Sequence, residues 1–193
     1  GVEVSIFDEK DCFNSTAQRE LVQYNLKLGV RCFYVCGTTG ESFSMSKEER
    51  MKVAATVRNE ASGDGAAVIV NVSHMEYRVV LELIEHAHSI GADAISLLPP
   101  IYFPISNDEL LQYWLSILDR ASPMPVTIYN IPSLTGSALT EPMVRRLAET
   151  PNFIGVKHST EDTFLLNRFK QVDGGRLLIW NGRDAYYLGD DQR

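Results

Sequence analysis

The chain has 193 residues, of which 45% are hydrophobic, and it carries a formal net charge of −7. This length and hydrophobic content are sufficient for one substantial core, so we expect a single domain over residues 1–193. The negative charge disfavours a general nucleic-acid or anionic-membrane surface. No apolar run is long enough to span a bilayer and no secretory signal opens the chain, so we expect a soluble cytoplasmic protein.

Short apolar strands alternate with helices along the chain, at about 30 residues per strand-and-helix unit. The expected strands cover residues 1–7, 31–36, 66–72, 94–98, 126–130, 153–157 and 177–180. The expected helices cover residues 16–28, 47–60, 74–90, 107–120, 141–149 and 162–171. Capping boxes of the form Ser-x-x-Glu or Ser-x-x-Gln support four of the helix starts, at Ser15, Ser46, Ser73 and Ser106.

This alternation predicts an α/β fold with a parallel sheet, and seven such strands fit a closed TIM (β/α)₈ barrel better than an open sheet. A whole barrel takes about 250 residues, whereas the sequence stops a few residues past the seventh expected strand. We therefore expect about seven βα units of a barrel whose C-terminal part is missing, within a longer native chain.

The cysteines and histidines give no sign of a metal site or a disulfide framework. Cys12, Cys32 and Cys36 form no CxxC pair. His86 and His88 are two residues apart on an expected helix, so they cannot face the same ligand. The sequence therefore predicts no bound metal.

The stretch over residues 152–160 places a lysine, Lys157, at the end of a buried apolar strand. Phe153, Ile154 and Val156 leave no solvated face, which is typical of a parallel strand that is covered on both sides. Burial disfavours an ammonium group more than the neutral amine, and a neutral lysine amine is the nucleophile of Schiff-base catalysis. The alternative is a lysine that extends to the strand end and pairs with a carboxylate.

In a (β/α)₈ barrel the active site lies at the carboxyl ends of the strands. The residues just past the apolar runs are hydroxyl-bearing or ionisable: Thr38, Thr39, Tyr102, Tyr129, Lys157 and Asp184. Neighbouring strands are about 4.8 Å apart, so Tyr129 and Lys157 are expected to approach one another if both face inward.

Gly37 and Gly40 bracket the two threonines in a turn whose N–H and hydroxyl groups are suited to a carboxylate. An ordinary glycine turn is the alternative. The turn lacks the spacing and the lysine of a phosphate-binding P-loop, so we do not expect a nucleotide site.

Three motifs together resemble one known family. They are Gly-Thr-Thr-Gly-Glu-Ser at 37–42, Tyr-Asn-Ile-Pro at 129–132 followed by Thr135 and Gly136, and Gly-Val-Lys at 155–157. Their order and spacing are similar to those of the family that contains dihydrodipicolinate synthase and N-acetylneuraminate lyase, the class I pyruvate-dependent aldolases. The resemblance covers nearly the whole chain.

The resemblance implies a role for each matching residue. Lys157 would form the Schiff base with the carbonyl of pyruvate or a 2-oxo acid, and Tyr129 would shuttle the proton. Thr38 and Thr39 would bind the carboxylate and join the proton relay, which Tyr102 would reach, in some members from a neighbouring subunit. The further residues expected to bind substrate are Gly37, Gly40, Ser159, Gly182 and Asp184. The resemblance also implies a dimer or tetramer, and no cofactor or metal, because the protonated imine is itself the electron sink.

Two departures bear on the substrate. Dihydrodipicolinate synthases usually carry arginine where this chain has Leu134, and an apolar side chain cannot hold a carboxylate as a guanidinium does. Sialic acid lyases usually carry glutamate where this chain has Ala185. We therefore expect a lyase that cleaves a sialic acid or 2-keto-3-deoxy sugar acid to pyruvate and an aldehyde, or the reverse condensation. The alternatives are a dihydrodipicolinate synthase and a barrel that binds a 2-oxo acid without turnover.

Overall fold

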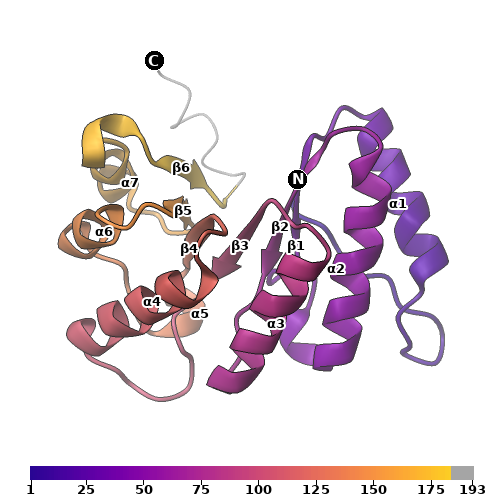
Figure 1. Ribbon diagram of the computed structural model, residues 1–193, viewed down its shortest axis with the longest axis horizontal. Coiled ribbons are helices and arrows are strands. Elements are labelled where there is room, and N and C mark those ends of the chain that lie inside the picture. Colours follow the sequence, from indigo (N-terminus) through magenta and orange to yellow (C-terminus); the bar gives the residue numbers. More distant parts are fainter. Residues whose placement is uncertain (184–193) are drawn as a thin grey trace. The chain divides into compact units, whose positions relative to one another are not determined.

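The computed structural model describes residues 1–183, in which parallel strands alternate with helices as the sequence predicts (Figure 1). The chain forms two compact units, Gly1–Ile95 and Ser96–Arg193, and each is described by itself. That residues 1–193 form a single domain stays a prediction. In the part of the chain that the structure describes, no helix is long and apolar enough to cross a membrane.

The first unit is built on a parallel pair of strands, in which Cys32 lies opposite Ala67 and Val35 opposite Val70. Helices α1 and α2 pack against each other, and α2 also contacts both strands (Figure 1). Val22 and Val57 are fully buried between these layers. The elements of this unit are α1 (Ser15–Lys27), β1 (Cys32–Val35), the 3₁₀ helix η1 (Ser42–Ser44), α2 (Lys47–Ser62), β2 (Ala67–Asn71) and α3 (Tyr77–Ser89), followed by the start of β3 (Ala94–Leu97).

The expected strand over residues 1–7 is wrong in its extent, because only Val2 forms a parallel bridge, to Tyr34 of β1. Beyond that bridge the Gln18 side chain replaces a neighbouring strand. Its carbonyl oxygen accepts from Ile6 N at 3.0 Å, and its amide nitrogen donates to Val4 O at 3.0 Å. A buried side chain from α1 therefore takes over the backbone hydrogen bonds that would extend the strand.

Two of the four expected capping boxes are confirmed, those of Ser46 with Glu49 and of Ser106 with Glu109. The box expected at Ser15 is wrong, since Asn14 caps α1 by accepting from Ala17 N. The box at Ser73 is also wrong. Helix α3 begins only at Tyr77, and Ser73 is buried among the residues that follow β2.

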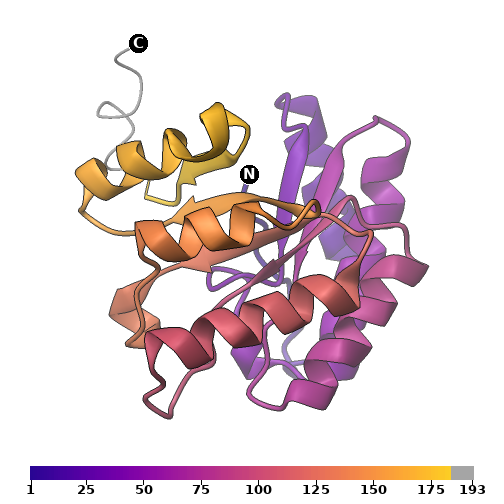
Figure 2. The same cartoon turned by 60° about the vertical axis from the view of Figure 1, so that its left-hand side comes forward.

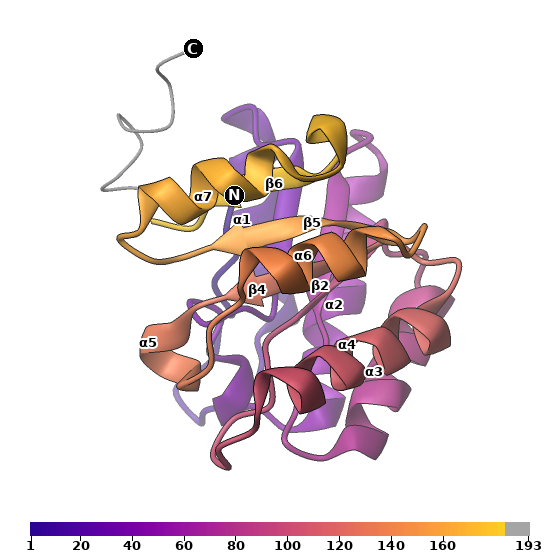
Figure 3. The same ribbon diagram turned by 90° about the vertical axis from the view of Figure 1, so that its left-hand side faces the viewer.

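The second unit contains three parallel strands in chain order, with β4 paired to β5 and β5 to β6. Helices α4 and α6 pack together on one side of the β4–β5 pair (Figures 2 and 3), and α6 also contacts α7. Trp114, Ile117 and Phe153 are buried in its core. Its elements are α4 (Asn107–Ala121), β4 (Val126–Asn130), α5 (Pro132–Thr135), α6 (Glu141–Ala148), β5 (Phe153–His158), α7 (Thr163–Lys170), the 3₁₀ segment η2 (Val172–Gly175) and β6 (Leu178–Asn181).

Because these strands are parallel, their carboxyl ends meet at one edge of the sheet. Tyr129, Lys157 and Trp180 lie side by side there, in register. Gly155 is needed for this arrangement, because a Cβ atom at that position would overlap the carbonyl oxygen of Leu178 on β6. The fold thus brings the ends of β4 and β5 together, where the sequence places a tyrosine and a lysine.

Candidate active site

Tyr129 and Lys157 form the centre of the site in the Ser96–Arg193 unit. They face one another across the β4–β5 pair and are 4% and 5% exposed. The Lys157 Nζ atom lies 4.1 Å from the centroid of the Tyr129 ring. The structure therefore places a buried amine and a phenol next to each other, as expected from the strand ends.

Ser159 and Gly182 lie directly beside this pair. Ser159 is only 3% exposed, and its Oγ atom has no hydrogen-bond partner among the described residues. A Cβ atom at Gly182 would overlap Ser159 Oγ and would lie 3.0 Å from Lys157 Cε. The absence of a side chain at 182 therefore leaves room for both groups. Buried hydroxyls are rarely left unbonded in native proteins, so Ser159 is available to a ligand.

A cavity of about 340 Å³ opens at this end of the strands. Its wall combines polar groups from the loops after β4, β5 and β6 with a few apolar side chains. Arg183 and Glu161 form an ion pair at 3.3 Å, and both line the cavity. The remaining lining residues are Asn130, Pro132, Ser133, Ala138, Ser159, Thr160, Asp162 and Leu165.

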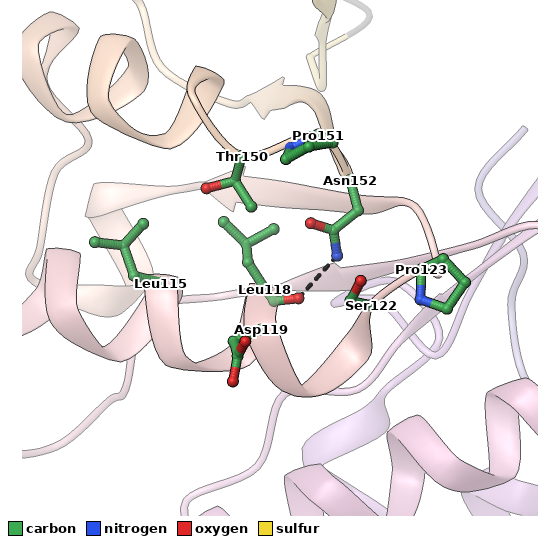
Figure 4. Close-up of a pocket in the computed structure, with 8 residues that line it drawn as sticks. All are labelled: Leu115, Leu118, Asp119, Ser122, Pro123, Thr150, Pro151 and Asn152. Carbon is green, nitrogen blue, oxygen red and sulfur yellow. Dashed lines mark hydrogen bonds between the residues drawn. The ribbon is translucent and has the colours of Figure 1, made fainter.

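A larger cavity of about 480 Å³ lies at the opposite, amino ends of β4 and β5 (Figure 4). Asn152, which directly precedes β5, donates through Nδ2 to Leu118 O at 2.8 Å, so its amide is already occupied. The lining also includes Ser122, Pro123 and Thr150. Since Lys157 closes the other end of β5, this cavity is not part of the candidate site.

The turn at residues 37–40 belongs to the Gly1–Ile95 unit and follows β1. Thr38 and Thr39 are exposed, whereas Gly37 and Gly40 are buried. Both glycines are required by close packing. A Cβ atom at Gly37 would lie 2.7 Å from the Tyr34 ring, and one at Gly40 would lie 3.0 Å from Glu3 O. The two threonines therefore lie exposed on a turn whose backbone packs closely against Tyr34 and Glu3.

An arginine that the sequence did not single out lies close to this turn. Arg50 of α2 is 1% exposed and donates from Nη1 to Ser73 O at 2.7 Å and from Nη2 to Asn71 O at 2.8 Å. The Cys36 thiol, just before the turn, donates to Arg50 O at 3.6 Å. Burial raises the pKa of Cys36 to about 11, although the nearby guanidinium opposes this shift. Burial also lowers the pKa of Arg50.

Glu3 is a further buried ionisable group of this unit. Its carboxylate accepts from Gln18 Nε2 at 2.9 Å and from Asn25 Nδ2 at 3.3 Å. Burial raises the pKa of Glu3 to about 7, and the two amide hydrogen bonds offset only part of the shift. Ser5, two residues later, donates to Gly40 O at 2.8 Å, which ties this segment to the 37–40 turn.

One expected site residue, Tyr102, is not brought into these groups. Tyr102 is 80% exposed, and its ring makes an edge contact with Phe103 at 4.9 Å. Its backbone has a φ of 83°, which is strained for a residue other than glycine. Asp184 lies outside the described residues. Within residues 1–183, no group of three or more metal-ligating side chains is assembled.

Two further buried residues, Asn130 and His158, were missed in the sequence. They directly follow Tyr129 and Lys157 and are opposite each other in the β4–β5 register. Side chains alternate along a strand, so these two belong to the other face of the sheet. In the sequence, the feature that could have identified Asn130 and His158 is that each directly follows a predicted site residue.

Comparison with known proteins assigns the chain to a family. Residues 2–190 match the model of the dihydrodipicolinate synthetase family. An N-acetylneuraminate lyase of Mediterraneibacter gnavus is 35% identical over 182 residues, which cover 94% of this chain and 58% of the relative. The chain therefore spans about three fifths of the length of that relative.

Solved structures show the same relationship. The sialic acid aldolase of Ruminococcus gnavus, solved as its catalytic lysine mutant, is 34% identical with a TM-score of 0.92, over 97% of this chain and 61% of that one. YagE, a prophage protein of Escherichia coli K12 solved with pyruvate, is 26% identical with a TM-score of 0.91, over 97% and 64% of the two chains. The predicted α/β fold of the TIM-barrel type is thereby confirmed, and the chain belongs to the dihydrodipicolinate synthetase family.

Proposed function

We propose that this protein is a class I aldolase of the lyase type, which cleaves a 2-oxo acid to pyruvate and an aldehyde through a Schiff base on Lys157. The observation that carries the proposal is the buried Lys157 amine, 4.1 Å from the ring centroid of Tyr129 at the same end of the sheet. Burial favours the neutral, nucleophilic form of an amine, and a neighbouring phenol can move protons. The solved aldolase with a mutated catalytic lysine supports the assignment by relationship.

In this mechanism the Lys157 amine attacks the carbonyl carbon of the 2-oxo acid, and loss of water leaves a protonated imine. The carbon–carbon bond then breaks, and its electron pair moves into the imine to give an enamine as the aldehyde departs. The hydroxyl that becomes the aldehyde carbonyl gives its proton to Tyr129, which supplied a proton when water was lost. Tyr129 then returns this proton to the methylene carbon of the enamine, which becomes the methyl group of pyruvate. Addition of water releases pyruvate and restores the amine, so the cycle requires no external oxidant or reductant.

The remaining residues would bind the substrate. Thr38 and Thr39, displayed on the 37–40 turn, would hold the carboxylate through hydroxyl and N–H groups. The Ser159 hydroxyl, which has no partner among residues 1–183, would bond to a hydroxyl of the aldehyde portion beside Gly182. Asp184 is proposed for the same portion by relationship. Pyruvate bound to a family member solved previously is consistent with this substrate class.

Tyr102 would complete the proton relay in an oligomer of this chain. Its 80% exposed ring and strained backbone support this role, because an exposed aromatic hydroxyl is accessible to a second subunit. The exposed Phe103 ring next to it would be covered in the same contact. We therefore propose a homo-oligomer, a dimer or tetramer, as the active form.

The aldehyde is proposed to be uncharged and derived from a sugar. Leu134 of α5 is 61% exposed and offers no positive charge to a second carboxylate. A coupled assay for pyruvate release tests this proposal with sialic acid and 2-keto-3-deoxy sugar acids as substrates. We expect at least one of them to release pyruvate, and condensation with aspartate semialdehyde to be slow. Efficient use of the semialdehyde would favour a dihydrodipicolinate synthase, and binding of 2-oxo acids without turnover would favour a non-catalytic barrel.

A further inference from the structure

The carboxyl ends of β4 and β5 carry a second buried polar pair that the mechanism above does not use. The Asn130 Nδ2 atom lies 2.9 Å from His158 Nδ1, and both residues are buried. His158 also contacts Thr160 Oγ1 at 2.7 Å and Asp162 O at 3.2 Å through Nε2. Its ring packs edge-on against Phe169 of α7.

These contacts determine which ring nitrogen of His158 carries the proton. Leu139 N donates to Asn130 Oδ1 at 3.0 Å, which fixes the orientation of the Asn130 amide and makes Nδ2 the donor to His158. Nδ1 of the imidazole must therefore accept. A carbonyl oxygen can only accept, so the contact with Asp162 O requires a hydrogen on Nε2. The ring is thus a neutral imidazole with its proton on Nε2, and each nitrogen has a distinct partner.

The backbone connects this pair directly to the reacting residues. Asn130 follows Tyr129 and His158 follows Lys157, and the two pairs are adjacent rungs of the same parallel ladder. Ser159 N donates to Asn130 O and Gly182 N donates to His158 O, each at 2.8 Å. The last rung therefore joins the end of β5 to those of β4 and β6, immediately beyond Tyr129 and Lys157.

We propose that His158 is a positioning residue, which acts through Asn130 to hold Tyr129 at the correct place relative to Lys157 for proton transfer. The inference rests on the proposed function. The Nδ1 acceptor holds the end of β4, while the Nε2 donor holds the loop at residues 160–162. A displacement on the order of 1 Å between catalytic groups is enough to slow a reaction by about 100-fold, so loss of this link affects proton transfer without removing a reacting group.

The test compares two events on the same protein. Imine formation is measured as the extent of borohydride trapping at saturating pyruvate, and proton transfer as the rate at which the pyruvate methyl protons exchange in D₂O by NMR. His158→Leu removes both hydrogen-bonding nitrogens. We expect its exchange rate to fall by about 10- to 100-fold while the extent of trapping stays that of the wild type.

Rescue distinguishes positioning from packing. His158→Gln keeps an acceptor for Asn130 and a donor for Thr160, so its exchange rate should return close to that of the wild type. Val156→Ala is the matched control, because Val156 is buried on the same face of β5 but two residues further from the strand end. It should leave exchange largely unchanged. If the leucine variant does not fold, His158→Asn, which is too short to reach both partners, replaces it with the same expected loss.

Each outcome decides between distinct explanations. Normal exchange in His158→Leu, or a loss in His158→Gln equal to that in the leucine variant, would overturn the positioning role. An equal loss in Val156→Ala would assign the effect to general loss of packing and also overturn it. If the wild type shows no trapping at all, the Schiff-base function itself fails and the inference fails with it.

Discussion

The two units bury ionisable side chains near their strand ends in different surroundings. In the Gly1–Ile95 unit, Arg50 donates to two backbone carbonyls and Glu3 accepts from two side-chain amides. In the Ser96–Arg193 unit, Lys157 lies over the ring of a tyrosine and beside the Ser159 hydroxyl, which has no partner within the described residues.

The difference shows that burial of a charge is not enough to identify a reactive group. Arg50 and Glu3 are bonded to neutral dipoles of the backbone or of side-chain amides, so they fix the segments around the 37–40 turn. Lys157 is surrounded by groups that can exchange a proton or bond to a ligand. We therefore expect substitutions in the first unit to change stability, and substitutions beside Lys157 to change turnover.

The largest effect is expected for Tyr129→Phe. The substitution keeps the ring that Lys157 contacts but removes the hydroxyl proton, so turnover should fall by about 10²- to 10⁴-fold, the usual share of general acid–base catalysis. The free energy of unfolding should change little. Steady-state kinetics together with urea unfolding measure both quantities. Near-normal turnover would transfer the proton role to another residue.

Arg50→Met tests the expectation that a substitution in the first unit changes stability. The variant leaves the carbonyls of Asn71 and Ser73 without their donors, so we expect the free energy of unfolding to fall by about 1–3 kcal/mol. Lys52→Met, at an exposed position of the same helix, is the control and should have almost no effect. Urea unfolding of both variants measures the difference. An Arg50→Met protein as stable as the control would show that the guanidinium does not support this region.

Glu3→Gln is expected to give an effect no larger than that of Arg50→Met, and its size depends on pH. Because burial raises the pKa of Glu3 to about 7, the folded protein favours the neutral carboxyl, and this contribution to stability is fully present below the ordinary value of 4.5. It is lost as the pH rises from there to about 7. The stability of the variant relative to the wild type should therefore rise over this interval, by on the order of 1–3 kcal/mol.

Unfolding by urea at a series of pH values measures this relative stability. Glu20→Gln, at an exposed position of α1, is the matched control and should show no such trend. A difference between Glu3→Gln and the wild type that does not vary with pH would contradict the assigned burial of the Glu3 charge.

The elements and the central pair could be predicted because they depend on local pattern. Lys157 and Tyr129 each end an apolar run, and in a parallel sheet such ends meet at one edge. The boxes at Ser46 and Ser106 were also predictable, since their partners lie three residues away. Local information was thus sufficient wherever the interaction stays within one element or follows from strand order.

The remaining features depend on contacts distant in sequence. Residues 1–7 do not form the expected strand, because the Gln18 side chain is bonded to Ile6 N and Val4 O. A period-two pattern cannot reveal such a contact. Arg50 lies between charged residues on α2 and has the pattern of a solvated side chain, but its carbonyl partners come more than 20 residues later. The link between Asn130 and His158 depends on the strand register, which the sequence does not specify.

The most direct test of the account is to trap the imine and locate it. Borohydride is added to the purified protein with pyruvate, and peptides are then mapped by mass spectrometry, with a sample lacking pyruvate as the control. We predict one reduced pyruvyl group per chain, on the peptide that contains Lys157, and none in the control. A pyruvyl group on another lysine, with Lys157 unmodified, would contradict the central claim.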